Sequence, residues 1–417
     1  MKIGILTFYR VDNFGANLQA LSTYCYLKNQ GHEPVMLEYV SRVTAVYSWI
    51  SDFKGKYKPK KRLVQKAEHL RFIDSHIKNQ IRNLHSSSDV FKAIKNNKIE
   101  AIIVGSDAVV QHWPLFSTLK FNLRRPYWFE PFPPERRFPN PFWGIGFANK
   151  IPTAMMAVSS QNSPYKKFSF ITLKRMKKTL ENIRYISVRD TWTRMMMLSS
   201  APSLDIDIMP DPVFALNQNL GDMIPSENEI RTKFKLPQSY VLVGLRSQIF
   251  SIEFLKELNE KFKEQGKECV AFNIDGAMAF NHPFAYEISV PLSPLCWFAL
   301  IKYSAAYIGC NMHPVVSALT CGVPCFSIDN WGSTNFWGKR IKDGSSKVQD
   351  VLSQYDVADW RRPIESGICE VTPQELVDRI NSFPVKKIRT VSAQRLDTYN
   401  QIMWKILVSF REKNGIT

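Results

Sequence analysis

The sequence predicts an α/β protein built from two blocks of alternating strands and helices. Short apolar runs of strand length alternate with stretches of helical spacing, which is typical of open parallel sheets. The alternation stops at a polar stretch, 217–235, and then resumes. The length of 417 residues also suits two domains better than one.

The first block opens with a strand, a polar turn and a helix. The run 3–8 is apolar and short, as in a buried parallel strand, and the turn 12–17 follows it. The helix 17–30 ends at Gly31 and leads to a strand over 33–40, which completes a βαβ unit. Helices are expected over 68–99 and 165–183, and further strands over 101–104, 153–159, 185–188 and 206–209.

The second block repeats this pattern after residue 235. Strands are expected at 240–245, 269–274, 306–309 and 324–328, and helices at 252–265, 294–303 and 313–319. The stretch 391–413 has helical character and could return to the first domain. We therefore expect an N-terminal domain over 1–218, a C-terminal domain over 219–390 and a C-terminal helix over 391–417.

The stretch 126–147 interrupts the first block. It holds six prolines and eight aromatic residues, and this density of proline disfavours helices and central strands. We expect a long loop, and long loops are uncommon unless they are functional. Its aromatic residues either pack in a local core or contact a membrane, together with the cationic run 54–62.

The charge is strongly basic. Lys and Arg number 55 and Asp and Glu 37, so the formal net charge is +18, which indicates an anionic partner. Seven scattered cysteines fit reduced thiols better than a disulfide scaffold or a zinc site. We see neither a signal peptide nor a membrane-spanning run, which predicts a cytoplasmic protein, with the inner face of the membrane as an open alternative.

The polar side chains that follow the strands are the candidates for chemistry, because ligands of open α/β sheets bind at the carboxyl ends of strands. His313 stands between a strand and a helix, where an imidazole could act as acid or base near neutral pH. Arg189 ends a strand and could bind a carboxylate or phosphate, and Arg246 is a weaker candidate. The turn with Asn13 and Gly15 either caps a helix or binds an anion.

Common nucleotide and hydrolase motifs are absent from the sequence. There is no GxGxxG, Walker A, HExxH or GxSxG motif, which disfavours dinucleotide oxidoreductases, P-loop enzymes, zinc proteases and α/β-hydrolases.

Six segments together resemble the polysaccharide pyruvyl transferase family. They are the opening KIGILTFYRVDNFGANLQAL, the Gly105-Ser106-Asp107 motif, the strand ending in Ser159, the Ser-Val-Arg-Asp run at 187–190, Asp211-Pro212, and the His-bearing turn within 307–324. The resemblance covers about residues 1–330 in the same order. At the His motif, which reads Asn311-Met312-His313-Pro314, the chain resembles a divergent member of that family.

The resemblance implies a fold, a reaction and a set of roles. The fold is two Rossmann-like domains facing a cleft, as in glycosyltransferase-B enzymes. The reaction transfers pyruvate from phosphoenolpyruvate, an anionic donor, to two hydroxyls of a sugar or a lipid-linked oligosaccharide, with no metal or resident cofactor. The implied catalytic residues are His313 and Asp107, the donor-binding residues Arg189, Arg246 and Asn311, and the acceptor-binding residues Asn13, Gly15, Gln19 and Ser159.

Two other functions remain open at this point. One is a nucleotide-sugar-dependent glycosyltransferase of similar two-domain shape. The other is a non-enzymatic basic binding protein, which the net charge permits. Nucleic acid is the least supported partner, because the sequence shows no folded nucleic-acid recognition motif.

Overall fold

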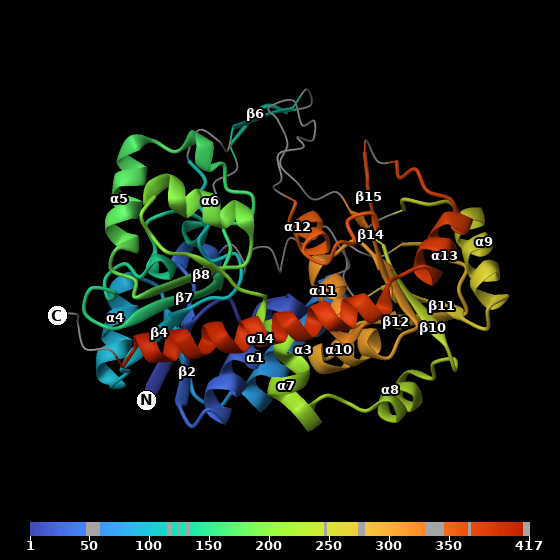
Figure 1. Ribbon diagram of the computed structural model, residues 1–417, viewed down its shortest axis with the longest axis horizontal. Coiled ribbons are helices and arrows are strands. Elements are labelled where there is room, and N and C mark those ends of the chain that lie inside the picture. Colours follow the sequence, from blue (N-terminus) through green and yellow to red (C-terminus); the bar gives the residue numbers. More distant parts are fainter. Residues whose placement is uncertain are drawn as a thin grey trace.

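The computed structural model shows two parallel sheets joined by a shared helical core (Figure 1). The structure describes residues 1–46, 59–114, 119–122, 125–129, 133–245, 248–273, 280–329, 346–365 and 368–411.

The N-terminal sheet has seven parallel strands in the order β3-β2-β1-β4-β7-β8-β9. Their bounds are β1 Lys2–Leu6, β2 Glu33–Tyr39, β3 Gln80–Leu84, β4 Ala101–Val104, β7 Thr153–Val158, β8 Tyr185–Val188 and β9 Asp207–Ile208. The order reverses between β1 and β4, and ligands of doubly wound sheets bind at such a reversal.

Helices cover both faces of this sheet. They are α1 Phe14–Asn29, α3 Pro59–His76, α4 Ser87–Asn96, α5 Phe170–Leu180 and α6 Thr191–Ser200. Side chains of β1 alternate between the two faces, so that Ile3 and Ile5 join the core on the side of α1, and Leu6 joins the core on the side of α4 to α6. Both faces of the sheet are therefore buried, as parallel sheets require.

The C-terminal sheet has six parallel strands in the order β12-β11-β10-β13-β14-β15, which reverses between β10 and β13. The strands are β10 Tyr240–Gly244, β11 Glu268–Asn273, β12 Tyr286–Ser289, β13 Ala306–Gly309, β14 Cys325–Asp329 and β15 Arg361–Pro363. The helices of this half are α8 Glu227–Phe234, α9 Ile252–Lys263, α10 Pro294–Lys302, α11 Met312–Cys321, α12 Lys347–Ser353 and α13 Pro373–Asn381.

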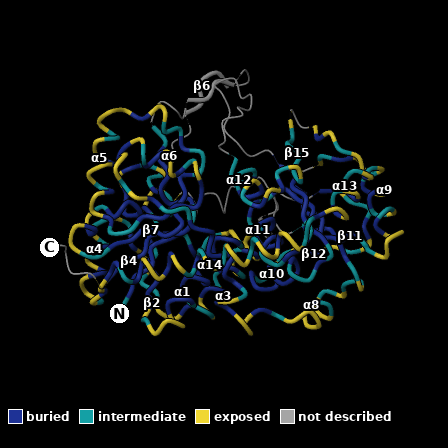
Figure 2. Tube along the Cα trace, in the orientation of Figure 1, coloured by how far each residue is buried: buried dark blue, intermediate teal, exposed yellow. Residues whose placement is uncertain are grey.

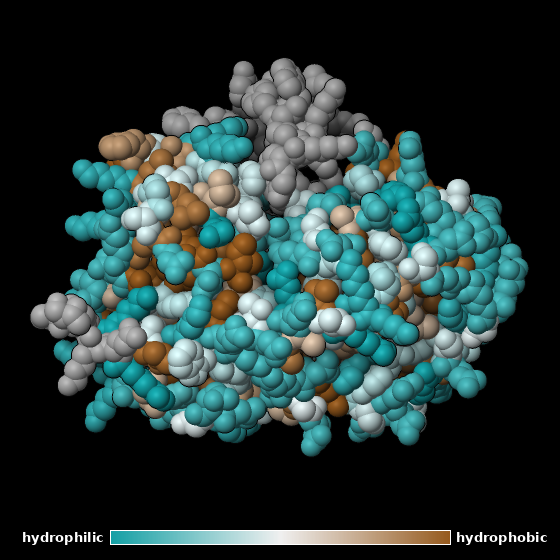
Figure 3. All heavy atoms as spheres, in the orientation of Figure 1, coloured by the Kyte–Doolittle hydropathy of each residue, from teal (hydrophilic) through white to brown (hydrophobic). Residues whose placement is uncertain are grey.

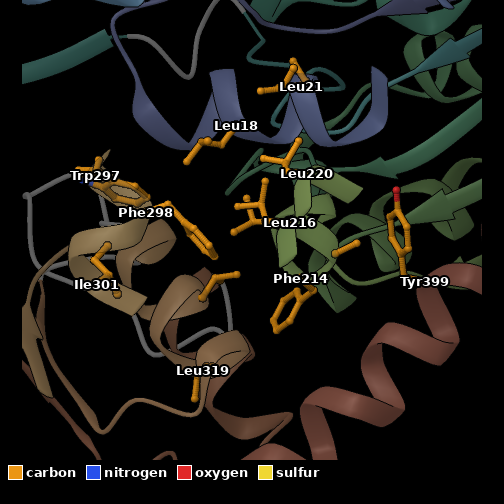
Figure 4. Packing of buried hydrophobic residues seen from close by; sticks show 14 of the residues in the cluster. Leu18, Leu21, Phe214, Leu216, Leu220, Trp297, Phe298, Ile301, Leu319 and Tyr399 are labelled. Carbon is orange, nitrogen blue, oxygen red and sulfur yellow. The ribbon is translucent and has the colours of Figure 1, made fainter. Parts of the chain in front are cut away.

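One hydrophobic core runs through both halves. It brings α1 together with α10, α11 and the connecting turn η5 Pro212–Ala215 and helix α7 Leu216–Leu220 (Figure 4). Helix α14, Val385–Ser409, lies along both halves and packs on α11 as well as on β7 and β8 (Figure 1). Figure 2 shows this buried zone as continuous across the molecule. The shared core fixes how the carboxyl ends of the two sheets face each other.

Several expectations about elements were wrong. The stretch 68–99 is not all helical, because β3 pairs with β2 at the edge of the sheet. The helix expected at 165–183 begins at Phe170, after the short turn η4 Tyr165–Lys167. The sequence pattern also missed α7, α8, β12, α12, β15 and α13.

The stretch 126–147 is not one irregular loop. It contains β6 Arg125–Phe129, which pairs with β5 Leu119–Asn122, and the short turns η2 Pro134–Arg136 and η3 Pro141–Trp143. The side chains of Phe142, Trp143 and Phe147 are fully buried, in the core on the side of α4 to α6. These aromatic residues therefore pack inside the domain and are not available to a membrane.

The domain boundaries remain a proposal, although the strands divide accordingly. All strands of the first sheet precede residue 209 and all strands of the second follow residue 239.

Candidate functional site

The carboxyl ends of the two sheets supply a cluster of polar side chains that face one another across the molecule. The N-terminal half contributes loops after β1, β4, β7, β8 and β9, and the C-terminal half contributes the turn between β13 and α11. These are the ends at which both strand orders reverse. The described candidates therefore follow strands or begin helices at these ends of the two sheets.

His313 lies against the other half of the molecule. It lies in the first turn of α11, and its imidazole rests on the backbone of Gly15 in the first turn of α1. A Cβ atom at position 15 would lie 2.1 Å from Cγ and 2.3 Å from Nδ1 of His313. Only glycine therefore fits at position 15 while the imidazole keeps this place.

The imidazole of His313 is electrically neutral at neutral pH. Burial lowers its pKa to about 4, and the charges of Arg189 and Lys347 act in the same direction. The carboxylates of Asp211 and Asp107 act against this shift without cancelling it. Its Nε2 atom is buried and makes no hydrogen bond to any described residue. A neutral ring with an unused nitrogen is suited to accept a proton.

Arg189 lies directly after β8, as expected, and it is paired within the protein. The guanidinium is buried, its Nη1 lies 2.6 Å from a carboxylate oxygen of Asp211, and its Nη2 lies 3.9 Å from Asp107. These carboxylates keep the pKa of Arg189 above its ordinary value although burial disfavours the charge. Asp211 is itself fully buried, so the pair is a fixed part of the site.

The Gly105-Ser106-Asp107 motif forms the turn after β4. Gly105 has φ +109°, and a Cβ there would lie 2.3 Å from the carbonyl oxygen of Met156, so the turn requires glycine. Ser106 donates a hydrogen bond of 2.7 Å to Oε1 of Gln19. Asp107 keeps a partly exposed carboxylate, which also accepts a hydrogen bond from the backbone N–H of Ala108.

Gln19 and Ser159 lie in this region but are buried. Gln19 is fully buried under the Gly105–Asp107 turn, where its amide holds Ser106. Ser159 donates a hydrogen bond of 2.6 Å to Asp190, and the other carboxylate oxygen of Asp190 caps α6 by accepting from the backbone N–H of Thr193. Both side chains therefore hold neighbouring turns in place: Gln19 holds the Gly105–Asp107 turn, and Ser159 holds Asp190 at the start of α6.

Asn13 and Asn311 each stand at the start of a helix. Asn13 is exposed and caps α1, since its Oδ1 accepts a hydrogen bond of 2.9 Å from the backbone N–H of Ala16. Asn311 is the N-cap residue of α11 but makes no side-chain capping bond to that helix. Arg246 lies outside the described residues.

Helix α12 brings two groups that the sequence did not single out. Burial lowers the pKa of Lys347 to about 8, with Arg189 acting in the same direction and with Asp107, Asp190 and Asp211 opposing it. Burial raises the pKa of Asp350 to about 6, and the charge of Asp190 adds to this. The C-terminal half therefore places a lysine and a carboxyl against the strand ends of the N-terminal half.

A signal for α12 exists in the sequence. Ser346 caps the helix by accepting from the backbone N–H of Gln349, and the apolar residues Val348, Val351 and Leu352 follow at helical spacing. The helix has only seven residues, which is too short for apolar spacing to distinguish it from a loop.

The described part of the chain contains no group of three or more His, Cys, Asp or Glu side chains that could hold a metal ion. Within those residues no helix combines the length and the apolar character needed to cross a membrane. All seven cysteines are described, and none forms a disulfide.

Comparisons with known proteins identify both the family and the fold. Residues 13–332 match the family model described as polysaccharide pyruvyl transferase. No curated protein matches the sequence.

Among solved structures, the chain resembles the UDP-GlcNAc 2-epimerase from Neisseria meningitidis bound to UDP-GlcNAc, with a TM-score of 0.54 and 11% identity over 98% of this chain and 100% of that one. A UDP-N-acetylglucosamine 2-epimerase candidate from Listeria monocytogenes gives a TM-score of 0.51 and 10% identity over 99% and 97%. At such identities the likeness shows the fold alone. It confirms the predicted class of two Rossmann-like domains in a glycosyltransferase-B-like arrangement.

Proposed function

The chain belongs to the polysaccharide pyruvyl transferase family, and on this premise we propose that it transfers pyruvate from phosphoenolpyruvate to a sugar as a cyclic ketal. A sugar hydroxyl oxygen bonds to C2 of the donor while C3 gains a proton and becomes a methyl group. The phosphate then leaves with the C2–O bond electrons, and a second hydroxyl oxygen takes its place. Of the two protons that the hydroxyls lose, one is accounted for by the proton added to C3 and the other is taken up by the released phosphate.

The observation that carries the proposal is the meeting of His313 with the cations Arg189 and Lys347 at the facing sheet ends. Phosphoenolpyruvate brings a phosphate and a carboxylate, which need cationic partners and backbone N–H groups at helix starts. Lys347 is mainly charged at neutral pH because its pKa is about 8. The first turn of α11, which Asn311 precedes, holds His313 within the influence of both cations. We assign the donor to these groups, and Arg246, which lies outside the described residues, is a further candidate from the sequence.

His313 acts as the acid and base of the first addition. Its neutral ring accepts the proton of the attacking hydroxyl at Nε2, and the resulting cation returns a proton to C3. The negative charge of the bound donor and the carboxylates of Asp107 and Asp211 stabilise that cation. Positioned acid–base groups of this kind contribute roughly 10²–10⁴-fold to rates.

The acceptor side belongs to the N-terminal half. Asp107 has a partly exposed carboxylate that can hold a sugar hydroxyl. Asn13 is exposed and stands at the start of α1, whose first turn holds Gly15 against His313. Gly15 leaves room for the imidazole, and Gln19 and Ser159 act as positioning residues. The acceptor class is a sugar or lipid-linked oligosaccharide of cell-surface polysaccharide biosynthesis. No resident cofactor is needed, because phosphoenolpyruvate is itself an activated donor.

The test is phosphate release from phosphoenolpyruvate in the presence of a panel of oligosaccharides. We expect acceptor-dependent release by the wild type and a loss of roughly 10²–10⁴-fold in His313→Gln. His76→Gln, in the last turn of α3, is the matched control and should retain activity. Release that persists in His313→Gln would overturn the assignment of His313. Acceptor-dependent use of nucleotide sugars in place of phosphoenolpyruvate would overturn the proposed donor.

A further inference from the structure

The first turn of α5 combines exposed apolar side chains with a dense group of cations. Phe170 and Ile171 are 80% and 70% exposed, which are the two highest values among the large hydrophobic side chains described. Six cations lie at 166, 167, 174, 175, 177 and 178, and the only acid between 163 and 183 is Glu181. We call Phe170, Ile171 and these six cations the α5 surface.

The exposed pair is not left over from an incomplete core. The inner face of α5 is buried through Met176 and Leu180, so the helix already packs on the sheet. Ser169 caps the helix, which fixes Phe170 and Ile171 on its outer first turn. Figure 3 shows hydrophobic surface over the part of the molecule that holds α5 and α6. Two adjacent large apolar side chains at a helix start therefore face water at a measurable cost in free energy.

The cations of the surface are mostly uncompensated within the protein. Lys177 lies 3.9 Å from Glu181, and Arg175 lies over the ring of Phe138. Within the described parts of the chain no acidic side chain pairs with Lys166, Lys167 or Lys174. The local charge thus favours an anionic partner, and Phe170 with Ile171 requires that this partner also accept apolar side chains.

The α5 surface lies at the same edge of the sheet as the candidate site. Helix α5 follows β7 and leads into β8, so its first turn lies toward the carboxyl ends of these strands. The segment between β7 and α5 is fixed, because Trp192 of α6 donates a hydrogen bond to the carbonyl of Ser163 and packs edge-on against Tyr165 at 5.0 Å. A planar surface that contacts α5 is therefore brought close to the sheet edge that carries Asp107 and Arg189.

We propose that the α5 surface docks the protein on an anionic lipid bilayer. Phe170 and Ile171 enter the interface between head groups and acyl chains, and the cations bind the anionic head groups. An adjacent pair of aromatic and aliphatic side chains favours a bilayer over nucleic acid, which offers no apolar layer for Ile171 to enter. This docking is independent of the proposed reaction and goes beyond it, since it would bring the site to sugars carried on lipids.

The test is flotation of the full-length protein with vesicles of phosphatidylcholine alone or mixed with phosphatidylglycerol. We expect binding to the anionic vesicles only, weakened several-fold by each charge that is screened or removed. The double variant Phe170→Ser/Ile171→Ser should lower the partition coefficient by about tenfold or more. The double variant Lys166→Glu/Lys167→Glu should lower it further, because two cations are lost and two anions are added.

Two control variants match these changes elsewhere on the surface. Trp404→Ser removes another large hydrophobic side chain, 65% exposed on α14, and Lys92→Glu/Lys95→Glu reverses two exposed charges on α4. Both should float as the wild type does, and circular dichroism melting should show that every variant is folded. Equal flotation of the Phe170→Ser/Ile171→Ser variant and the wild type would overturn the proposal. The proposal would also be overturned if the wild type did not float with anionic vesicles, or if it bound nucleic acid but not vesicles. Phosphate release from phosphoenolpyruvate with a free acceptor tests the reaction separately.

Discussion

Replacing Gly15 by alanine tests the contact that joins the two halves of the site. The added Cβ would lie 2.1 Å from Cγ of His313, whereas ordinary contact begins near 3.4 Å, so the ring must move by at least 3.4 − 2.1 = 1.3 Å. The clash is with an aromatic ring in the first turn of α11, not with the end of a flexible side chain. The imidazole or the interface must therefore give way.

Both stability and rate respond to this displacement. Overpacking of a close contact costs roughly 1–3 kcal/mol. Alanine is otherwise favoured over glycine inside a helix by about 1 kcal/mol, so without His313 the same substitution would be neutral or stabilising. A misplacement of about 1 Å in a catalytic group can lower the rate by roughly 10²-fold. We expect a fall in kcat of that order for Gly15→Ala.

A double-mutant cycle separates the clash from other effects. Denaturant unfolding of the wild type, Gly15→Ala, His313→Ala and the double variant should give a coupling free energy of about 1–3 kcal/mol. Gly31→Ala is the control for a glycine whose added Cβ meets nothing within 4 Å, although its φ of +74° makes the substitution strained. It should lower stability and leave kcat unchanged. A coupling near zero together with a wild-type kcat for Gly15→Ala would refute the assigned contact.

Three further variants test the charges of the site. Asp211→Asn leaves the buried guanidinium of Arg189 without its 2.6 Å partner and should destabilise the fold by roughly 3–5 kcal/mol, seen as a lower Tm; an unchanged Tm would contradict this. Lys347→Met should raise KM for phosphoenolpyruvate at pH 7, and the wild-type KM should rise as pH passes about 8, where the lysine loses its charge; a flat profile to pH 9.5 would argue against Lys347 as a donor ligand. Asp350 has a raised pKa of about 6, so the stability that its protonated form contributes is present at low pH and is lost as pH rises through 6. Asp350→Asn should therefore raise Tm at pH 7.5 and have little effect at pH 4. Equal changes in Tm at the two pH values would show that burial beside Asp190 does not raise the pKa of Asp350.

The rule that ligands bind at strand ends directed attention to residues that the structure brings together, and the site itself stays a prediction. Asp107 and Arg189 follow strands of the first sheet and His313 follows a strand of the second, so the apolar runs place each at the carboxyl edge of its own sheet. The shared core, which the sequence pattern does not show, brings the two edges together. The partners of these residues could not be predicted in the same way. Asp190 is next to Arg189 in sequence, but its carboxylate points to the start of α6, while the guanidinium reaches Asp211 after the neighbouring strand β9.

The elements that were missed share weak apolar patterns. The strand β3 reads QIRNL and lies at the edge of its sheet, where only one of its five residues is buried. Helix α12 spans only Lys347–Ser353, so Lys347 had no predicted element to place it at the site. Asn13 and Gln19 were predicted as acceptor-binding residues, but their side chains make contacts within the protein. Asn13 caps α1, and the buried amide of Gln19 accepts a hydrogen bond from Ser106.

Detection of the product tests the central claim most directly. The protein is incubated with phosphoenolpyruvate and an oligosaccharide acceptor, and the acceptor is analysed by mass spectrometry and NMR. The proposed function predicts an acceptor that carries one pyruvate as a cyclic ketal, with a methyl signal from C3 and one phosphate released per ketal. An acceptor that remains unchanged across the panel while phosphoenolpyruvate is intact, or that gains a sugar from a nucleotide sugar, would contradict it.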